Sequence, residues 1–264
     1  SLSLLDHGWI QAYAEDAQEA LDLALMSFYV AEHKDVATPF MANLDGFTLT
    51  HTYEVVDVPD AERADEFLPP YETDNKISFD DPKNLGFSAG PDTNTEFKYK
   101  EHLGILNARK VIKECEDKFF KIFNRKYSGL IETYKTEDAD FVIVTLGTIS
   151  GLVKEVVDDL RDKGQKVGLL RIRYLRPFPN EEIVEALKNV KAIGVLEKDI
   201  SFGNEGTVYT NVNSALHKAK LDVVSSNYIA GLGGRNIEKH QIEDIFTRLQ
   251  SLNHEIVFVG LKEE

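Results

Sequence analysis

The chain has 264 residues and a formal net charge of −15, and 42% of its residues are hydrophobic. Because this charge repels nucleic-acid phosphates, we expect protein or small-molecule partners and no nucleic acid. We find no apolar run long enough to cross a membrane and no signal peptide at the start, so we expect no membrane contact and a cytoplasmic location. The single cysteine, Cys115, excludes an internal disulfide framework and any cluster built from this chain's thiols alone.

The first fifty residues have the pattern of the rear part of a domain. We expect a strand over residues 9–14, a helix that begins after Glu15 and Asp16, and a second strand over residues 38–44. One helix between two strands cannot close a hydrophobic core of its own. We therefore expect the preceding strand and helix to lie in missing sequence or in another chain.

The next segment, residues 57–100, carries five of the eight prolines and shows little periodicity. This composition predicts an extended connector. From residue 100 to residue 134 apolar residues recur at spacings of three, four and seven, which predicts a long amphipathic helix. We therefore divide the chain into residues 1–56, a connector at 57–100 and a second domain at 101–264.

The second domain alternates between continuous apolar strands and amphipathic helices. The expected strands cover residues 140–147, 166–173, 192–197 and 222–230. The expected helices cover residues 149–163, 180–189, 205–218 and 237–252. This alternation predicts a parallel sheet that is covered by helices on both faces, and thus an α/β fold.

Glycine-rich turns that follow three of the expected strands are candidates for anion binding. They lie at residues 145–151, at residues 201–206 and around Gly233, Gly234 and Arg235. Backbone N–H groups at such turns can hold a phosphate or carboxylate. A close strand-to-helix turn also needs glycine for steric reasons, so an ordinary tight turn remains open for each of them.

Three arginines lie near one strand. The alternation puts Arg171 and Arg173 on one face and Arg176 at the carboxyl end, where open α/β sheets bind ligands. They suit a carboxylate or phosphate partner, and they equally suit ion pairs at a subunit interface, which we favour. We find no self-contained catalytic constellation and no metal-binding spacing in the chain.

Two further polar residues, Asp45 and His51, follow the second expected strand. A loop aspartate and histidine this close together could position a substrate or a cofactor. Formation of the turn is the competing explanation for the aspartate.

Five motifs in order closely resemble the alpha subunit of pyruvate:ferredoxin oxidoreductase, within the 2-oxoacid:ferredoxin oxidoreductase family. They cover residues 8–20, 43–52, 173–179, 196–206 and 228–235. The resemblance extends over the whole chain and is less specific for pyruvate than for the family. It departs at Leu5, where the family usually has an arginine before the position of Asp6.

The resemblance implies the rear part of a thiamine-diphosphate pyrimidine-binding domain, followed by a transketolase C-terminal-like parallel α/β domain. It implies oxidative decarboxylation of a 2-oxoacid, with acetyl transfer to coenzyme A and electron transfer to ferredoxin. It assigns no catalytic residue to this chain, and only Asp45 and His51 are peripheral cofactor-site candidates. Thiamine diphosphate, Mg²⁺ and [4Fe-4S] clusters would be bound in a complete complex with beta, gamma and delta-type subunits. The second domain would form dimer contacts.

Three alternatives remain open. The chain could serve another 2-oxoacid:ferredoxin oxidoreductase. It could be a stand-alone assembly module that holds an anion at Gly147, Gly203 or Gly231. It could also be the beta chain of a lipoamide-linked 2-oxoacid dehydrogenase.

Overall fold

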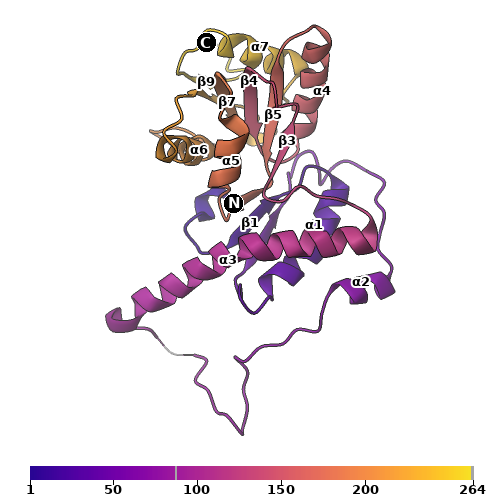
Figure 1. The fold of residues 1–264 in the computed structure, drawn as a ribbon, viewed down its shortest axis with the longest axis vertical. Helices are drawn as coiled ribbons and strands as arrows, with labels where there is room; N and C mark the ends of the chain where they lie inside the picture. Colours follow the sequence, from indigo (N-terminus) through magenta and orange to yellow (C-terminus); the bar gives the residue numbers. More distant parts are fainter. Residues whose placement is uncertain (87, 263–264) are drawn as a thin grey trace.

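The structure is a computed structural model that describes residues 1–86 and 88–262. Two sheets with their helices lie one above the other, and a long arm extends away from the lower sheet (Figure 1). The strands are β1 Ile10–Tyr13, β2 Phe40–Asn43, β3 Ile131–Tyr134, β4 Phe141–Thr145, β5 Val167–Ile172, β6 Tyr174–Arg176, β7 Ala192–Glu197, β8 Val224–Ile229 and β9 Ile256–Phe258. The helices are α1 Ala17–Ala31, α2 Ala61–Phe67, α3 Pro91–Phe123, α4 Ile149–Asp162, α5 Asn180–Leu187, α6 Thr207–Lys218 and α7 Lys239–Leu249, with short 3-10 turns η1 Leu2–Leu4 and η2 Leu232–Gly234.

The first sheet has the strand order β2-β1-β6. β1 and β2 are the two strands that the sequence predicted; they are parallel, and α1 connects them. Helix α1 begins at Asp16 because its carboxylate accepts a hydrogen bond from the Glu19 N–H at 2.7 Å. The third strand, β6, comes from the second half of the chain and pairs antiparallel with β1. This crossover joins the two halves through main-chain hydrogen bonds.

The second sheet has the strand order β3-β5-β4-β7-β8-β9. Apart from β3, its strands are parallel. Apolar side chains of α5 and α6 share one core cluster with the sheet, and those of α4 and α7 share the other. The predicted parallel sheet with helices on both faces is therefore confirmed.

The long predicted helix is present but ends earlier than residue 134. Asn124 adopts the left-handed conformation with φ 55° and terminates α3. The residues up to 134 include β3, so the prediction of helix there was wrong. Its alternating Ile-Glu-Thr-Tyr pattern suits an edge strand, and it pairs antiparallel with β5.

Helix α3 shares its core with the first sheet. Ala108, Ile112 and Phe119 are buried against α1 residues such as Met26. The connector is also partly ordered, since Phe67 at the end of α2 is fully buried in the same cluster. The domain limits of 1–56, 57–100 and 101–264 stay a prediction, and this packing favours moving the last limit to the end of α3.

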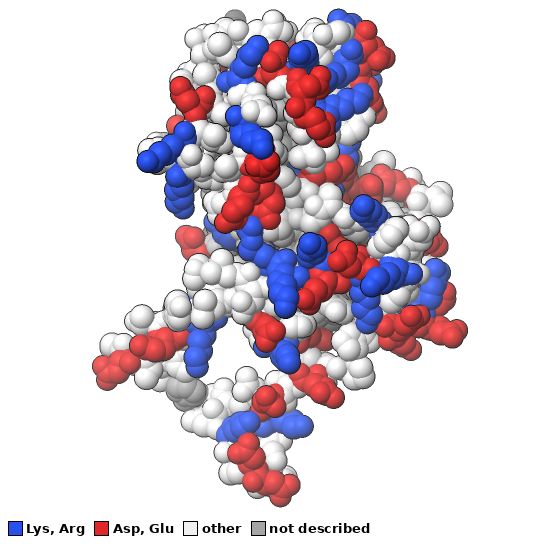
Figure 2. Space-filling model, in the orientation of Figure 1, with Lys and Arg blue, Asp and Glu red and all other residues white. Residues whose placement is uncertain are grey.

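Residues 68–86 and the first turns of α3 form the arm at the bottom of Figure 1. Acidic and basic side chains are intermixed over the face of the described residues in Figure 2. Of the helices in the described ranges, none is both long and apolar enough to cross a membrane.

Candidate functional site

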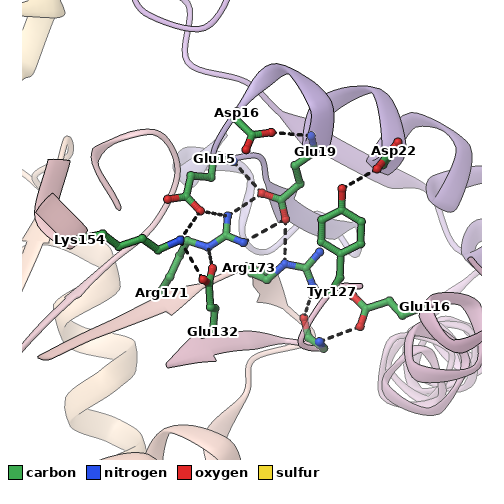
Figure 3. A network of polar contacts seen from close by, with 11 residues as sticks. Glu15, Asp16, Glu19, Asp22, Glu116, Tyr127, Glu132, Lys154, Arg171 and Arg173 are labelled. Carbon is green, nitrogen blue, oxygen red and sulfur yellow. Dashed lines mark hydrogen bonds and ion pairs between the residues drawn. The ribbon is translucent and has the colours of Figure 1, made fainter. Parts of the chain in front are cut away.

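A buried network of charges lies between the two sheets (Figure 3). Glu19, in the first turn of α1, is at its centre and is only 3% exposed. Its carboxylate accepts hydrogen bonds from Arg171 Nη1 at 2.6 Å and from Arg173 Nε at 2.8 Å. The sequence pattern predicted that these two arginines lie on one face of the strand. In the structure this face is directed toward α1.

The network continues into three further elements. Arg173 Nη1 also contacts Glu116 of α3 at 2.5 Å. Arg171 Nε donates to Glu132 of β3 at 2.7 Å, and Lys154 of α4 forms an ion pair with the same glutamate at 2.8 Å. The network therefore fastens α1 and α3 to β3, β5 and α4.

The charges of the network stabilise one another. Burial alone would raise the pKa of Glu19, but the two guanidinium groups lower it to about 2. The same carboxylates raise the pKa of Arg171 and Arg173 against the effect of burial. Arg173 was a candidate for anion binding or a subunit interface. At 1% exposure and with its partners inside the chain, it instead joins internal elements.

The third arginine has a different environment. Arg176 is half-buried at the end of β6, and its Nη1 donates to the Leu175 carbonyl at 2.7 Å. Burial lowers the pKa of its guanidinium, while Asp6 and Tyr13 oppose this shift. Arg176 therefore stays a candidate for contact with an anion or a neighbouring subunit.

A cavity of about 310 Å³ lies at the junction of the two sheets, and carboxyl ends of strands from each sheet line it. Its walls include Ala14 and Asn43, which follow or end β1 and β2, and Thr145 and Glu197, which end β4 and β7. Carboxyl ends of parallel strands are the usual ligand edge of α/β sheets. The junction therefore brings two such edges together.

Asp45 bridges this junction. Its carboxylate forms an ion pair with Lys198 and accepts hydrogen bonds from Thr148 Oγ1 at 3.0 Å and from the Phe47 and Thr48 N–H groups at 2.9 and 3.0 Å. Burial would raise the pKa of Asp45, but these donors and Lys198 hold it well below its usual range. The anion that faces the turn at residues 145–151 is thus a carboxylate of the chain itself.

His51 lies apart from Asp45. Its ring nitrogen is 3.1 Å from the Thr50 hydroxyl, the side chain is exposed, and it lines neither of the two cavities at the junction. The two candidates are therefore close in sequence but do not form one site.

Glu197 was not singled out from the sequence. Its buried carboxylate accepts hydrogen bonds from the Val208 and Tyr209 N–H groups at the start of α6, at 2.8 and 3.1 Å, and from Asn227 at 2.9 Å. Burial raises its pKa to about 7, and these hydrogen bonds oppose the rise. A Cβ on Gly206 would lie 1.9 Å from Glu197 Oε1, so glycine is required there. The sequence signal that could have identified Glu197 is a glutamate at the end of an apolar strand, just before a glycine-rich turn.

The third glycine turn differs from the other two. Gly231, Gly233 and Gly234 all have positive φ, at 68°, 64° and 82°. Arg235 follows them, and its Nη1 donates to the Gly260 carbonyl at 2.6 Å. The ring of Phe47, from the loop after β2, packs on Gly234, where a Cβ would lie 2.7 Å away. A second cavity of about 590 Å³ lies beside this turn.

Both halves of the chain match known protein families. Residues 1–117 match the family described as pyruvate flavodoxin/ferredoxin oxidoreductase, thiamine diphosphate binding, and residues 139–242 match pyruvate:ferredoxin oxidoreductase core domain II. Pyruvate synthase subunit PorA of Methanothermobacter thermautotrophicus is 41% identical over 264 residues, which cover 100% of this chain and 68% of that relative. The chain belongs to the 2-oxoacid:ferredoxin oxidoreductase family. It is a subunit of such an enzyme, as the five motifs predicted.

Relatives within the 2-oxoacid:ferredoxin oxidoreductase family differ in the oxoacid that their names specify. Ketoisovalerate oxidoreductase subunit VorA of Pyrococcus horikoshii is 42% identical over 93% of this chain and 62% of its own length. A solved 2-oxoglutarate:ferredoxin oxidoreductase from Magnetococcus marinus has the same fold, with a TM-score of 0.55 and 16% identity over 94% of this chain and 44% of that chain. The family assignment and the α/β fold are thus shown.

Proposed function

We propose that the chain is the alpha-subunit part of a pyruvate:ferredoxin oxidoreductase. The complete enzyme would convert pyruvate, coenzyme A and oxidised ferredoxin into acetyl-CoA, CO₂ and reduced ferredoxin. The observation that carries the proposal is the match of the whole chain to subunits of pyruvate synthase, at 38–42% identity. The similar identity of the ketoisovalerate relatives makes a branched-chain 2-oxoacid the alternative substrate.

The share of this chain would be scaffold and subunit interface. Thiamine diphosphate supplies the bond-breaking chemistry when it is bound. Among the described residues, no group of three or more His, Cys, Asp or Glu side chains could hold a metal ion, so we propose that the diphosphate and Mg²⁺ are bound by another subunit. Asp45 pairs with Lys198, which leaves it a positioning role at the edge of the cofactor site.

Iron–sulfur clusters would likewise be held by other subunits. Cys115 is buried in the core, and burial raises the pKa of its thiol, which opposes the thiolate form that a cluster needs. Beta, gamma and delta-type subunits, ferredoxin and coenzyme A are therefore the partners that we propose for the complete enzyme, with the cytoplasm as its location. Arg176 is the residue that we propose for a contact with one of these subunits.

Reconstitution with the other subunits tests the proposal. The complex should reduce ferredoxin with pyruvate and coenzyme A, and the chain alone should neither do so nor bind thiamine diphosphate with Mg²⁺ in calorimetry. A complex that prefers 3-methyl-2-oxobutanoate by tenfold or more in kcat/KM would assign the alternative substrate. Micromolar binding of the cofactor by the isolated chain would contradict the scaffold role.

A further inference from the structure

Of the three glycine turns, only the first two are next to a carboxylate of the chain that accepts hydrogen bonds from the turn or from the helix after it. The turn at residues 231–236 has no such carboxylate among the described residues. The turn at residues 145–151 faces Asp45, and the helix that follows residues 201–206 binds Glu197. In the part of the chain that the structure describes, no carboxylate lies within ion-pair distance of Arg235, whose guanidinium donates to the Gly260 carbonyl. The first two turns are therefore internally neutralised, and the third is not.

The cavity beside this turn has the size and lining of a small-molecule site. Its volume of about 590 Å³ falls within the roughly 300–1,000 Å³ that is typical of ligand pockets. Its lining includes the cationic residues Lys198 and Arg235 and the apolar residues Ile149, Leu152 and Ile237. A ligand that matches this lining has an anionic head and an apolar body.

The glycine turn allows the side chains of Lys198 and Arg235 to reach the same cleft. A Cβ on Gly231 would lie 3.3 Å from Lys198 Cε, so the lysine stem packs over the glycine turn. Arg235 lies four residues after Gly231 in the same turn, and both Lys198 and Arg235 line the cavity. A planar guanidinium and a compact ammonium together suit an oxyanion better than either does alone.

We propose that this cleft binds a small organic anion. A carboxylate or phosphate head would lie between Lys198 and Arg235, with an apolar body against Ile149, Leu152 and Ile237. Asp45 lines the same cavity and is paired with Lys198, so it competes with the ligand for this ammonium.

The first test uses four probes on the purified 264-residue chain, in calorimetry at constant ionic strength. Hexyl phosphate and hexanoate carry both head and body, inorganic phosphate carries the head alone, and hexanol carries the body alone. At least one hexyl anion should bind at least tenfold more tightly than inorganic phosphate, and hexanol should not bind. The tighter of the two hexyl anions identifies the head group. Equal binding of inorganic phosphate and both hexyl anions would overturn the proposal.

The second test uses substitutions in the cleft. Arg235→Gln should weaken binding of the better hexyl anion at least tenfold, while Arg248→Gln, an exposed arginine on α7, should leave it unchanged. Asp45→Asn should strengthen binding several-fold because it removes the competing charge, and Lys198→Gln should weaken it. Circular dichroism melting verifies that each variant is folded. Equal effects of Arg235→Gln and Arg248→Gln, or weaker binding by a folded Asp45→Asn, would refute the site.

Discussion

Glu19 and Arg173 are 154 residues apart in the chain, yet their side chains form a hydrogen-bonded ion pair of 2.8 Å in the interior. Glu19 belongs to the first turn of α1, and Arg173 lies between β5 of the second sheet and β6 of the first. Burying such a pair is costly unless its groups have partners, and each of these residues has a second ion-pair partner, although Arg173 Nη2 is buried without a hydrogen bond. The pair therefore couples the stability of the two halves of the chain.

Glu19→Gln should strongly destabilise the protein. The substitution leaves Arg171 and Arg173 buried with fewer counter-charges, and removal of one partner from a buried pair costs roughly 3–5 kcal/mol. The free energy of unfolding from urea denaturation measures the loss. Glu62→Gln, on the exposed side of α2, is the matched control and should change it by less than about 0.5 kcal/mol. A similar small change for Glu19→Gln would show that the network contributes little.

The same carboxylate should make the protein sensitive to acid. The pKa of Glu19 is about 2 in the folded protein and near its ordinary value of 4.5 when unfolded. Since the folded pKa is lowered, this stabilisation is present above pH 4.5 and is lost as the pH falls through 4.5 toward 2, for a total of about 3 kcal/mol. Unfolding measured between pH 6 and pH 3 should show a steeper loss for the wild type than for Glu19→Gln. Parallel curves would contradict the assignment.

Gly206→Ala should destabilise the second domain. The added Cβ would overlap the Glu197 carboxylate, so the glutamate must leave the N–H groups of α6 or the turn must shift. We expect a loss of roughly 1–3 kcal/mol, measured by thermal unfolding. Gly86→Ala provides the control because its Cβ would meet no atom within 4 Å. Equal melting temperatures for the two variants would show that the turn has room to relax.

Limited proteolysis should cut the chain within residues 69–86. This part of the arm extends away from the body, and Phe79 is fully exposed in it. The two fragments should elute together in gel filtration, because α3 packs on α1 and β6 pairs with β1. A first cut inside α2, or separation of the fragments without denaturant, would contradict the packing described above.

Asp45→Ala should lower the activity of the complete complex mainly through assembly or cofactor retention. The residue ties the loop after β2 to Lys198 and Thr148, and a hydrogen bond to a charged group is worth roughly 1.5–3 kcal/mol. Activity and thiamine diphosphate content should fall together, whereas Asp65→Ala on exposed α2 should change neither. A mutant complex that retains its cofactor but loses turnover by several orders of magnitude would make Asp45 catalytic instead.

The sequence predicted the central strands because each is a continuous apolar run, as in β4 and β7. It missed β3, β6 and β9, which have only three or four residues and carry no such run. Their pairing depends on partners far along the chain, and local periodicity does not report these partners.

The polar sites show the same limit. Alternation placed Arg171 and Arg173 on one face, but it did not reveal that this face meets Glu19, more than 150 residues away. Two of the glycine turns lie next to anions, but these anions are Asp45 and Glu197 of the chain itself. The residue composition identifies a turn that can bind an anion. Only the tertiary structure shows which carboxylate lies beside that turn.

The passage of the chain from β5 to β6 restricts motion between the sheets. One residue, Arg173, separates the two strands, and its own side chain is ion-paired with Glu19 of α1 and Glu116 of α3. A hinge needs a few residues whose backbone dihedrals are free to change, and none is available here. Motion between the sheets is therefore restricted at this crossing, and we expect any opening of the junction to a ligand to come from the loops around Asp45 and Arg235.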